Sequence, residues 1–588
     1  MSATTLVRGP RRTKQASERA PRASVAADVS PRARRRTRRA QDDGVLFSVA
    51  SPSAVRARAL ALGLLASSVP VLGRATAQDP FLPAIRWTQA PDAASPAIPR
   101  AVAFGADENA AWAAWSGSNP AFSAAAAHAQ GANAPLAREP AAPGSAGSIG
   151  AAAGTGPWLY ALSQVPAPDA WHRRTVVHGS WVDDAAASGG SLPSQGLAPR
   201  WSRELPFAAN GAARIATDAS GAWVWVAAHD DAAQRVRVER LDGATGVVLF
   251  ARELDANGLQ EIAVASGGSR AVLATGLGLW VFDAQGAIVH QAALTATTTA
   301  LAIAGDGSTI AHGAQGLLRV LRDGPTGFVL THATSANAGE MAVRAALDGT
   351  GATLAIGWWS ANSGTAWRFE VRDTLIDARI EQRAFAGAAG GLQDLPTAVA
   401  LTADGTRAAF ACWGTGTSAP EAAIWDRASD AYVLEADLPG SAFALALDST
   451  GTRALVAAKT THANVLAATG EVRLLDTGER DLQVLQPPLV GGTLHLAARA
   501  TGATAVLFLH GDPVTVPFSV PGIAGQLRLR RVGLGVARLN ADAQGRADWS
   551  SPIPFDSAQI GTVRSFQAAF RSPGSTRFGT TLLRVRIL

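Results

Sequence analysis

Three oxygen-bearing side chains in the segment NADAQGRAD are the best candidates for a metal site in this sequence. Asn540, Asp542 and Asp548 alternate around Gly545, and alternating oxygen ligands in a tight loop suit Ca²⁺. The bidentate Glu that ends an EF-hand loop is missing, and a plain hairpin turn explains the same residues. We therefore regard the three residues as weak candidates and expect no metal and no cofactor.

The chain lacks the short motifs of several enzyme classes. It has no His-Glu-x-x-His zinc motif, no Cys-x-x-Cys-His haem motif, no Gly-x-Ser-x-Gly nucleophile elbow and no phosphate-binding loop. Its single cysteine, Cys412 in AFACWG, fits a small buried strand residue better than a reactive thiol. We name no catalytic residue, and the sequence favours a protein that is not an enzyme without deciding the question.

Six aspartates recur where predicted apolar strands end: Asp242, Asp283, Asp323, Asp373, Asp426 and Asp476. Their spacings are 41, 40, 50, 53 and 50 residues. Most of them precede a Gly-containing turn, where a carboxylate can accept backbone N–H groups. We interpret all six as structural turn residues.

Each of these aspartates follows two short apolar segments joined by an Asp/Gly turn, as in ARIATDASGAWVWVAA and ALALDSTGTRALVAA. A fourth apolar segment follows most of them, for example VVLFAREL, AYVLEADL and LQVLQPPL. Four strands in about 40–50 residues is the spacing of β-propeller blades. Two divergent units near 100–140 and 150–206 precede these repeats, so the sequence predicts seven or eight blades. AIRWTQAP at 84–91 could add an edge strand to the last blade and close the ring.

The pattern DxSGxxxxVA…VxxLDxxTGxxL resembles the YVTN/WD40-type repeats of secreted bacterial proteins over most of 100–490. VERLDGATGVVLFAREL is also similar to a quinoprotein repeat, although Phe250 stands where that family prefers Trp. The resemblance implies an all-β, quinoprotein-like propeller of the bacterial exported type. It concerns repeat architecture, so it carries the fold and not an activity.

The repeat period breaks after the segment LQPPLVGG. Residues 491–588 alternate predicted strands with Gly, Pro and Asp turns, as expected for a small C-terminal β-sandwich. This layout is similar to modules that end many exported proteins of high-GC bacteria, for which attachment or sorting is the usual interpretation. We therefore expect a propeller over 78–490 and a β-sandwich over 491–588.

Residues 55–77 have the three parts of a signal peptide. The basic start is Arg56 and Arg58, the apolar run is 59–72, and the small-x-small cleavage site is Ala75 and Ala77 before Gln78. A membrane span needs about 20 apolar residues, and this run is shorter. We expect an exported protein, periplasmic, cell-surface or extracellular, with no transmembrane segment once the signal is removed.

Residues 1–54 are expected to be a disordered basic segment that results from a mis-assigned translation start. Residues 1–77 hold 15 of the 52 Lys and Arg and 4 of the 46 Asp and Glu, so their net charge is +11. The remainder holds 37 basic and 42 acidic residues, a net charge of −5. That balance gives no electrostatic reason to expect nucleic acid as a partner.

Three functions fit these observations. The first is an exported, non-catalytic propeller that binds a protein or glycan partner. The second is a cell-surface or structural component held by the C-terminal module. The third is a propeller enzyme of the lactonase or quinoprotein dehydrogenase type, which needs convergent charged or metal-binding residues at the centre of the ring.

Overall fold

A computed structural model of the chain describes part of its residues. These are 79–90, 97–104, 110–117, 123–129, 137–138, 148–153, 158–166, 173–181, 200–208, 212–230, 233–276, 278–294, 296–314, 316–386, 393–414, 419–465, 469–486, 488–531, 534–559 and 562–587. The expected basic segment 1–54 and signal peptide 55–77 lie outside these residues.

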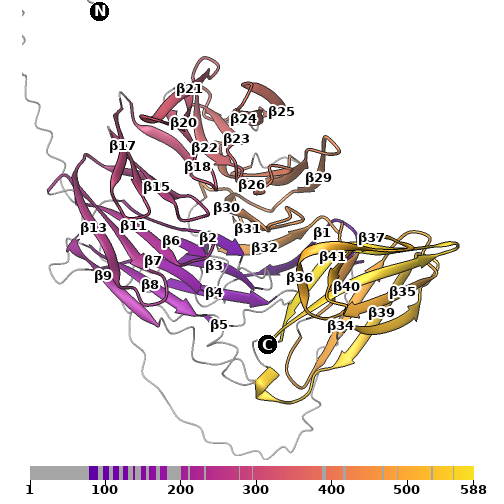
Figure 1. Cartoon of the computed structure of the whole chain (residues 1–588). Helices are drawn as coiled ribbons and strands as arrows, with labels where there is room; N and C mark the ends of the chain where they lie inside the picture. Colours follow the sequence, from indigo (N-terminus) through magenta and orange to yellow (C-terminus); the bar gives the residue numbers. More distant parts are fainter. Residues whose placement is uncertain are drawn as a thin grey trace, which may run out of the picture. The chain divides into compact units, whose positions relative to one another are not determined.

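Across the residues that the structure describes, eight four-stranded antiparallel sheets follow one another (Figure 1). Their inner strands are β2 (Ala97–Phe104), β6 (Ser148–Ala153), β10 (Ala213–Thr217), β14 (Leu259–Val264), β18 (Thr298–Ile303), β22 (Glu340–Leu347), β26 (Pro396–Leu401) and β30 (Ala442–Leu447). The second strands are β3 (Ala110–Gly117), β7 (Trp158–Pro166), β11 (Trp223–Asp230), β15 (Arg270–Thr275), β19 (Thr309–Ala314), β23 (Thr353–Ser360), β27 (Arg407–Cys412) and β31 (Arg453–Lys459).

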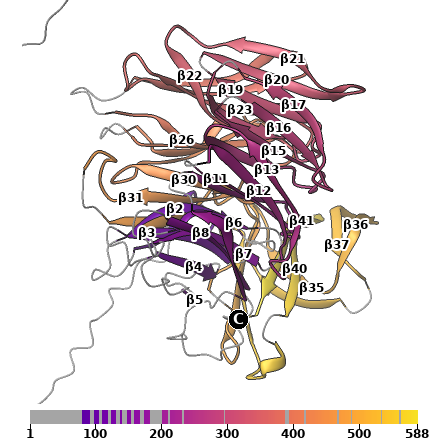
Figure 2. The same cartoon turned by 90° about the vertical axis from the view of Figure 1, so that its left-hand side faces the viewer.

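The third strands are β4 (Ser123–Ala129), β8 (Arg173–Trp181), β12 (Arg235–Asp242), β16 (Gly278–Asp283), β20 (Leu317–Gly324), β24 (Trp367–Asp373), β28 (Ala422–Asp426) and β32 (Gly470–Asp476). The fourth strands are β5 (Ala137–Arg138), β9 (Trp201–Ala208), β13 (Val248–Asp255), β17 (Ile288–Ala293), β21 (Gly327–Ser335), β25 (Ala378–Phe385), β29 (Ala431–Ala436) and, in the last sheet, β1 (Ala84–Gln89). Each inner strand contacts the next, and β30 contacts β2, so the sheets close a ring (Figure 2). The fold is therefore an all-β propeller, as the sequence predicts.

The ring is closed by the strand that precedes all the others. β1 pairs antiparallel with β32, from Ala84 opposite Asp476 to Gln89 opposite Val472. AIRWTQAP thus has the role that the sequence suggested. The expectation that LQVLQPPL forms the outer strand of the last blade is wrong, because β1 occupies that edge of β32.

The apolar core of the propeller lies between neighbouring sheets. Seven clusters of buried residues each combine side chains of two adjacent sheets, including the pair formed by the last sheet and the first. Between the sixth and seventh sheets, for example, Trp367 and Phe369 meet Phe410 and Trp425. Short Val-, Ile- and Ala-rich strands buried on both faces suit this arrangement. The repeated hairpins therefore gain their stability from stacking against the next repeat.

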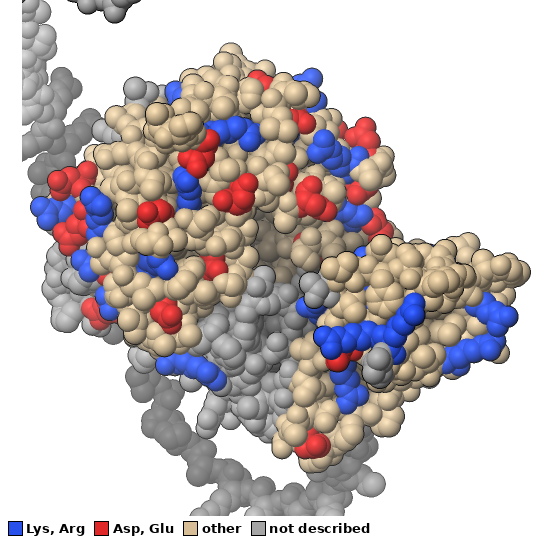
Figure 3. All heavy atoms as spheres, viewed as in Figure 1, with Lys and Arg blue, Asp and Glu red and all other residues tan. Residues whose placement is uncertain are grey.

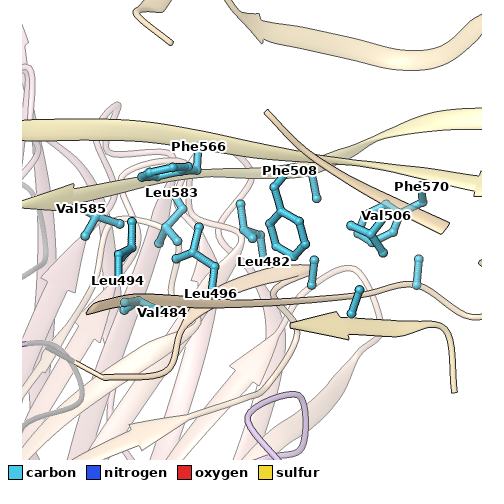
Figure 4. Close-up of a cluster of buried hydrophobic side chains, with 14 of the residues drawn as sticks. Leu482, Val484, Leu494, Leu496, Val506, Phe508, Phe566, Phe570, Leu583 and Val585 are labelled. Carbon is cyan, nitrogen blue, oxygen red and sulfur yellow. The ribbon is translucent and has the colours of Figure 1, made fainter. Parts of the chain in front are cut away.

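The C-terminal module consists of two sheets. One contains β33 (Leu482–Val484), β34 (Thr493–Arg499) and β39 (Arg546–Pro552), and the other contains β36 (Pro513–Val520), β37 (Ile523–Leu529), β41 (Ser575–Arg586), β40 (Val563–Ser572), β35 (Ala505–His510) and β38 (Gly535–Asn540). A 3₁₀ turn covers Ser557–Gln559. Side chains of both sheets point toward one another and form one buried cluster (Figure 4).

The strands place the change of module earlier than the expected boundary at 490/491. β32 ends at Asp476, and β33 already pairs with β34, with Leu482 opposite Ala498. β33 consists of the LQV of the segment LQVLQPPL. Its apolar side chains Leu482 and Val484 belong to the buried cluster of the module, which explains why the segment leaves the propeller.

The residues before β1 contact the C-terminal module. Arg499 donates to the Asp79 carboxylate at 2.7 Å and to the Phe81 carbonyl at 2.9 Å. Its guanidinium also lies 4.7 Å from the centre of the Phe81 ring. The segment that closes the ring is therefore also bound by the module that follows the ring.

Candidate functional site

The six recurrent aspartates all lie at the ends of third strands. Five accept a backbone N–H of the following turn at 2.8–2.9 Å: Asp242, Asp283, Asp373, Asp426 and Asp476. The sixth, Asp323, accepts a hydrogen bond of 2.6 Å from Arg270 of the preceding sheet. These contacts fix turns and neighbouring sheets, and they bring no two of the six carboxylates together.

The weak calcium candidates lie around one hairpin of the C-terminal module. Asp542 accepts the backbone N–H of Gln544 and of Arg546 at 2.9 and 2.8 Å. Asp548 forms an ion pair with Arg546 at 2.8 Å, and Asn540 is the last residue of β38. The carboxylates are thus used within the turn. Within the described ranges, no three His, Cys, Asp or Glu side chains are grouped so that they could hold a metal ion.

The expected signal residues Ala75, Ala77 and Gln78 lie outside the described residues. In the part of the chain that the structure describes, no helix is long and apolar enough to cross a membrane.

Cys412 is buried beside two carboxylates that sequence reasoning missed. Burial raises the pKa of the thiol, and the charges of Asp394 and Glu421 raise it further. Burial also raises the pKa of Asp394 to about 6, although Trp367 donates to it at 2.6 Å, and raises that of Glu421 to about 8. Each carboxylate lies just before an apolar strand, a placement that could have identified it. Their hydrogen bonds to Gly414 and Leu438 hold loops in place.

The inner strands share a feature that positions side chains near the ring axis. Seven of the eight, all except β10, have a register shift of one residue against their second strand near the start of the pairing. Such bulges re-aim side chains and are frequent next to functional sites. We call the residue after the bulge, with its equivalent in β10, the axis position. The axis positions are Ala101, Gly150, Arg214, Glu261, Ala300, Arg344, Ala398 and Ala444.

Charge is concentrated at three axis positions. Arg214 and Glu261, on adjacent inner strands, form an ion pair with Nε and Oε1 3.7 Å apart. Arg344 donates from Nε to the carbonyl of Thr397 and from Nη1 to the carbonyl of Val343 at 2.7 Å. At the bulge itself, Arg100 lies over the Phe443 ring, 5.0 Å from its centre. The charges of Arg214, Glu261 and Arg344 act on one another, and these three side chains form the candidate site at the ring axis.

Sequence reasoning missed this site, although the repeats contain the signal. The hairpins ARIATD, EIAVAS and VRAALD carry a charge four residues before the turn. ALAIAG, AVALTA and ALALDS have alanine there. Aligning the repeats position by position would have separated charged from apolar axis positions.

Comparisons with known proteins find similarity among solved structures only. No family model matches the chain, and no curated protein matches it. Among solved structures, it is similar to the β-propeller domain of Cps50 (Swd1) from Myceliophteria thermophila, with 12% identity and a TM-score of 0.38. That likeness covers 55% of this chain and 97% of the other. The β-propeller follows from the described sheets and the contacts between their inner strands.

Proposed function

We propose that this protein is an exported, non-catalytic β-propeller of the YVTN/WD40-like type that binds a protein partner around the ring axis. The supporting observation is the set of charged side chains at the axis positions of an otherwise alanine-rich inner rim. Propellers are ring scaffolds whose loops and central openings commonly bind partners. A glycan partner is less well supported, because Trp358 is buried and packs under Arg368.

A photo-crosslinking amino acid at two positions tests this proposal. Asn362 lies in the exposed loop between β23 and β24, and Leu330 is exposed on the outer strand β21. We expect a defined protein adduct in native extracts from position 362 and none from position 330. Equal labelling from both positions, or none from 362, would contradict binding at the ring face.

The export proposal has its own measurement. Mass spectrometry of the protein isolated outside the cytoplasm is expected to give Gln78 as the first residue. A mature terminus upstream of Val55 would contradict it.

A second candidate, attachment of the protein to an anionic cell surface, is favoured by the charge of the C-terminal module. Residues 491–588 contain eleven Arg and no Lys, but four Asp and no Glu. On the face seen in Figure 3, the coloured side chains of the module are mostly basic. Replacing the exposed Arg530, Arg571 and Arg584 by Glu should release the protein from the cell envelope. Unchanged fractionation would leave the propeller as the binding element.

A further inference from the structure

Arg344 differs from the other charged residues at the axis positions because, among the described residues, it forms no ion pair. Arg214 has the Glu261 carboxylate 3.7 Å away. Across the described residues, no carboxylate lies within ion-pair distance of Arg344, whose partners are two backbone carbonyls. A guanidinium has five N–H donors, so most of its capacity for hydrogen bonds is unused.

Arg344 is accessible to solvent and lies within reach of the charges of its neighbours. The residue is exposed on the inner strand β22. Partial burial of the side chain lowers its pKa, the Glu261 carboxylate raises it, and the Arg214 guanidinium lowers it again. A ligand that approaches along the ring axis can therefore contact this guanidinium.

The neighbouring inner strands have alanine at their axis positions. On β18 and β26, which flank β22, the axis positions are Ala300 and Ala398. Ala300 packs into the cluster between the fifth and sixth sheets, and Ala398 packs against the cluster between the seventh and eighth. The axis positions of the flanking strands therefore offer Arg344 neither a polar contact nor a counter-charge.

The charge at the axis is opposite to that of the rest of the ring. Residues 78–490 contain 26 Lys and Arg against 38 Asp and Glu, a net charge of −12. Among the axis positions, Arg214 and Arg344 outnumber Glu261. A local positive site in a chain of net negative charge favours an anionic group at the axis.

From these observations we infer that Arg344 binds an acidic side chain of the partner, an Asp or Glu carboxylate presented at the ring axis. This inference rests on the proposed function and specifies the chemistry of the bound group. The ion pair between Arg214 and Glu261 is an example within this chain of a guanidinium that binds a carboxylate at the axis. A carboxylate can accept two parallel N–H bonds from a guanidinium, so the match is geometric as well as electrostatic.

Calorimetric titration of the full chain with acetylated, amidated hexaglutamate tests the inference, with hexaglutamine and hexalysine as comparison peptides. We expect wild type to bind hexaglutamate and neither of the others. Arg344→Ala should weaken binding by about tenfold or more, as loss of a charge-assisted pair predicts. The matched control is Arg252→Ala, which removes the same charge from an exposed position of the outer strand β13 and should leave affinity unchanged.

A third variant protects the test against misfolding. Glu261→Gln releases Arg214 from its carboxylate and should strengthen hexaglutamate binding several-fold, a gain that a damaged fold cannot produce. The inference is overturned if wild type fails to bind hexaglutamate, if hexaglutamine binds equally well, or if Arg344→Ala stays within twofold of wild type. If position 362 still crosslinks to a partner, such a result contradicts only the inference about Arg344 and not the proposal that the ring binds a protein.

Discussion

The propeller and the C-terminal module bury their apolar residues in different ways. In the propeller, separate clusters lie between successive sheets, so each sheet depends on its two neighbours. In the module, residues of both sheets form one large cluster (Figure 4), and a smaller cluster lies within the six-stranded sheet. The charges differ as well, at −12 for 78–490 and +7 for 491–588. We therefore expect a core substitution to affect two neighbouring sheets in the ring, and to affect both sheets of the module when it falls in the large cluster.

Removing one fully buried ring from each region tests that difference most strongly. Phe508→Ala in the module and Phe369→Ala in the propeller should each lower the free energy of unfolding by about 3–5 kcal/mol. Hydrogen exchange should then distinguish them. We expect faster exchange in all module strands for the first variant, and only in the sixth and seventh sheets for the second. Uniform acceleration across the propeller would refute the regional interpretation.

For ion pairs, we expect the larger loss of stability in the propeller and the smaller one in the module. Asp448 is 2% exposed and binds Arg453 at 3.1 Å and Arg480 at 2.5 Å. Asp448→Asn should therefore cost about 3–5 kcal/mol, because two cations lose their partner. In the module, Asp548 is 52% exposed in its pair with Arg546, and Asp548→Asn should cost at most about 1 kcal/mol. Urea unfolding measures both.

The same pair defines an acid dependence. Burial by itself would raise the pKa of Asp448, but Arg453 and Arg480 lower it below its ordinary value. A carboxyl with a depressed folded pKa contributes stability above its unfolded pKa and loses that contribution as the pH falls through the folded value. Wild type should lose stability on acidification below about pH 4, and Asp448→Asn should lose less.

Glu421 should produce a pH dependence of the reverse sign in the propeller. Its folded pKa of about 8 lies above the ordinary value, so the folded state retains a proton that the unfolded state has released. Stability therefore falls as the pH rises from about 5 to 8, by about 1.4 kcal/mol per pH unit for one proton. Glu421→Gln should flatten this slope. An unchanged slope in thermal melts would show that another group titrates.

Glycine substitutions are expected to give the smallest difference in stability between the two regions. Gly351 and Gly502 both have positive φ, at 70° and 74°. A Cβ at Gly351 would lie 2.4 Å from Thr309 Oγ1, whereas a Cβ at Gly502 would meet nothing within 4 Å. Gly502→Ala should cost only backbone strain of about 1–2 kcal/mol, and Gly351→Ala should cost more. Equal melting temperatures for the two variants would mean that the propeller turn relaxes.

Much of the fold could be predicted from local patterns. The Asp/Gly turns specify hairpins, and the position of Asp at each third-strand end holds across six sheets. The assignment of LQVLQPPL to the propeller is wrong because an apolar run indicates a buried strand but does not specify the strand with which it pairs. Competition with β1 for the edge of β32 is a long-range property. Arg344 escaped notice for a related reason: a single charge in an apolar strand becomes informative only when ring closure places it near Glu261 and Arg214.

The pairing of β1 with β32 has a consequence for how the chain reaches its native state. Ala84 can pair with Asp476 only after nearly four hundred further residues have been synthesised. Contacts of such sequence separation form slowly, because a long loop must close before the contact is gained. Until then β32 has an unpaired edge, a surface prone to wrong pairing with another chain. We therefore expect the pairing of β1 with β32 to be a slow step of folding in which the open edge of β32 favours aggregation. A chaperone that covers this strand edge would act at that step.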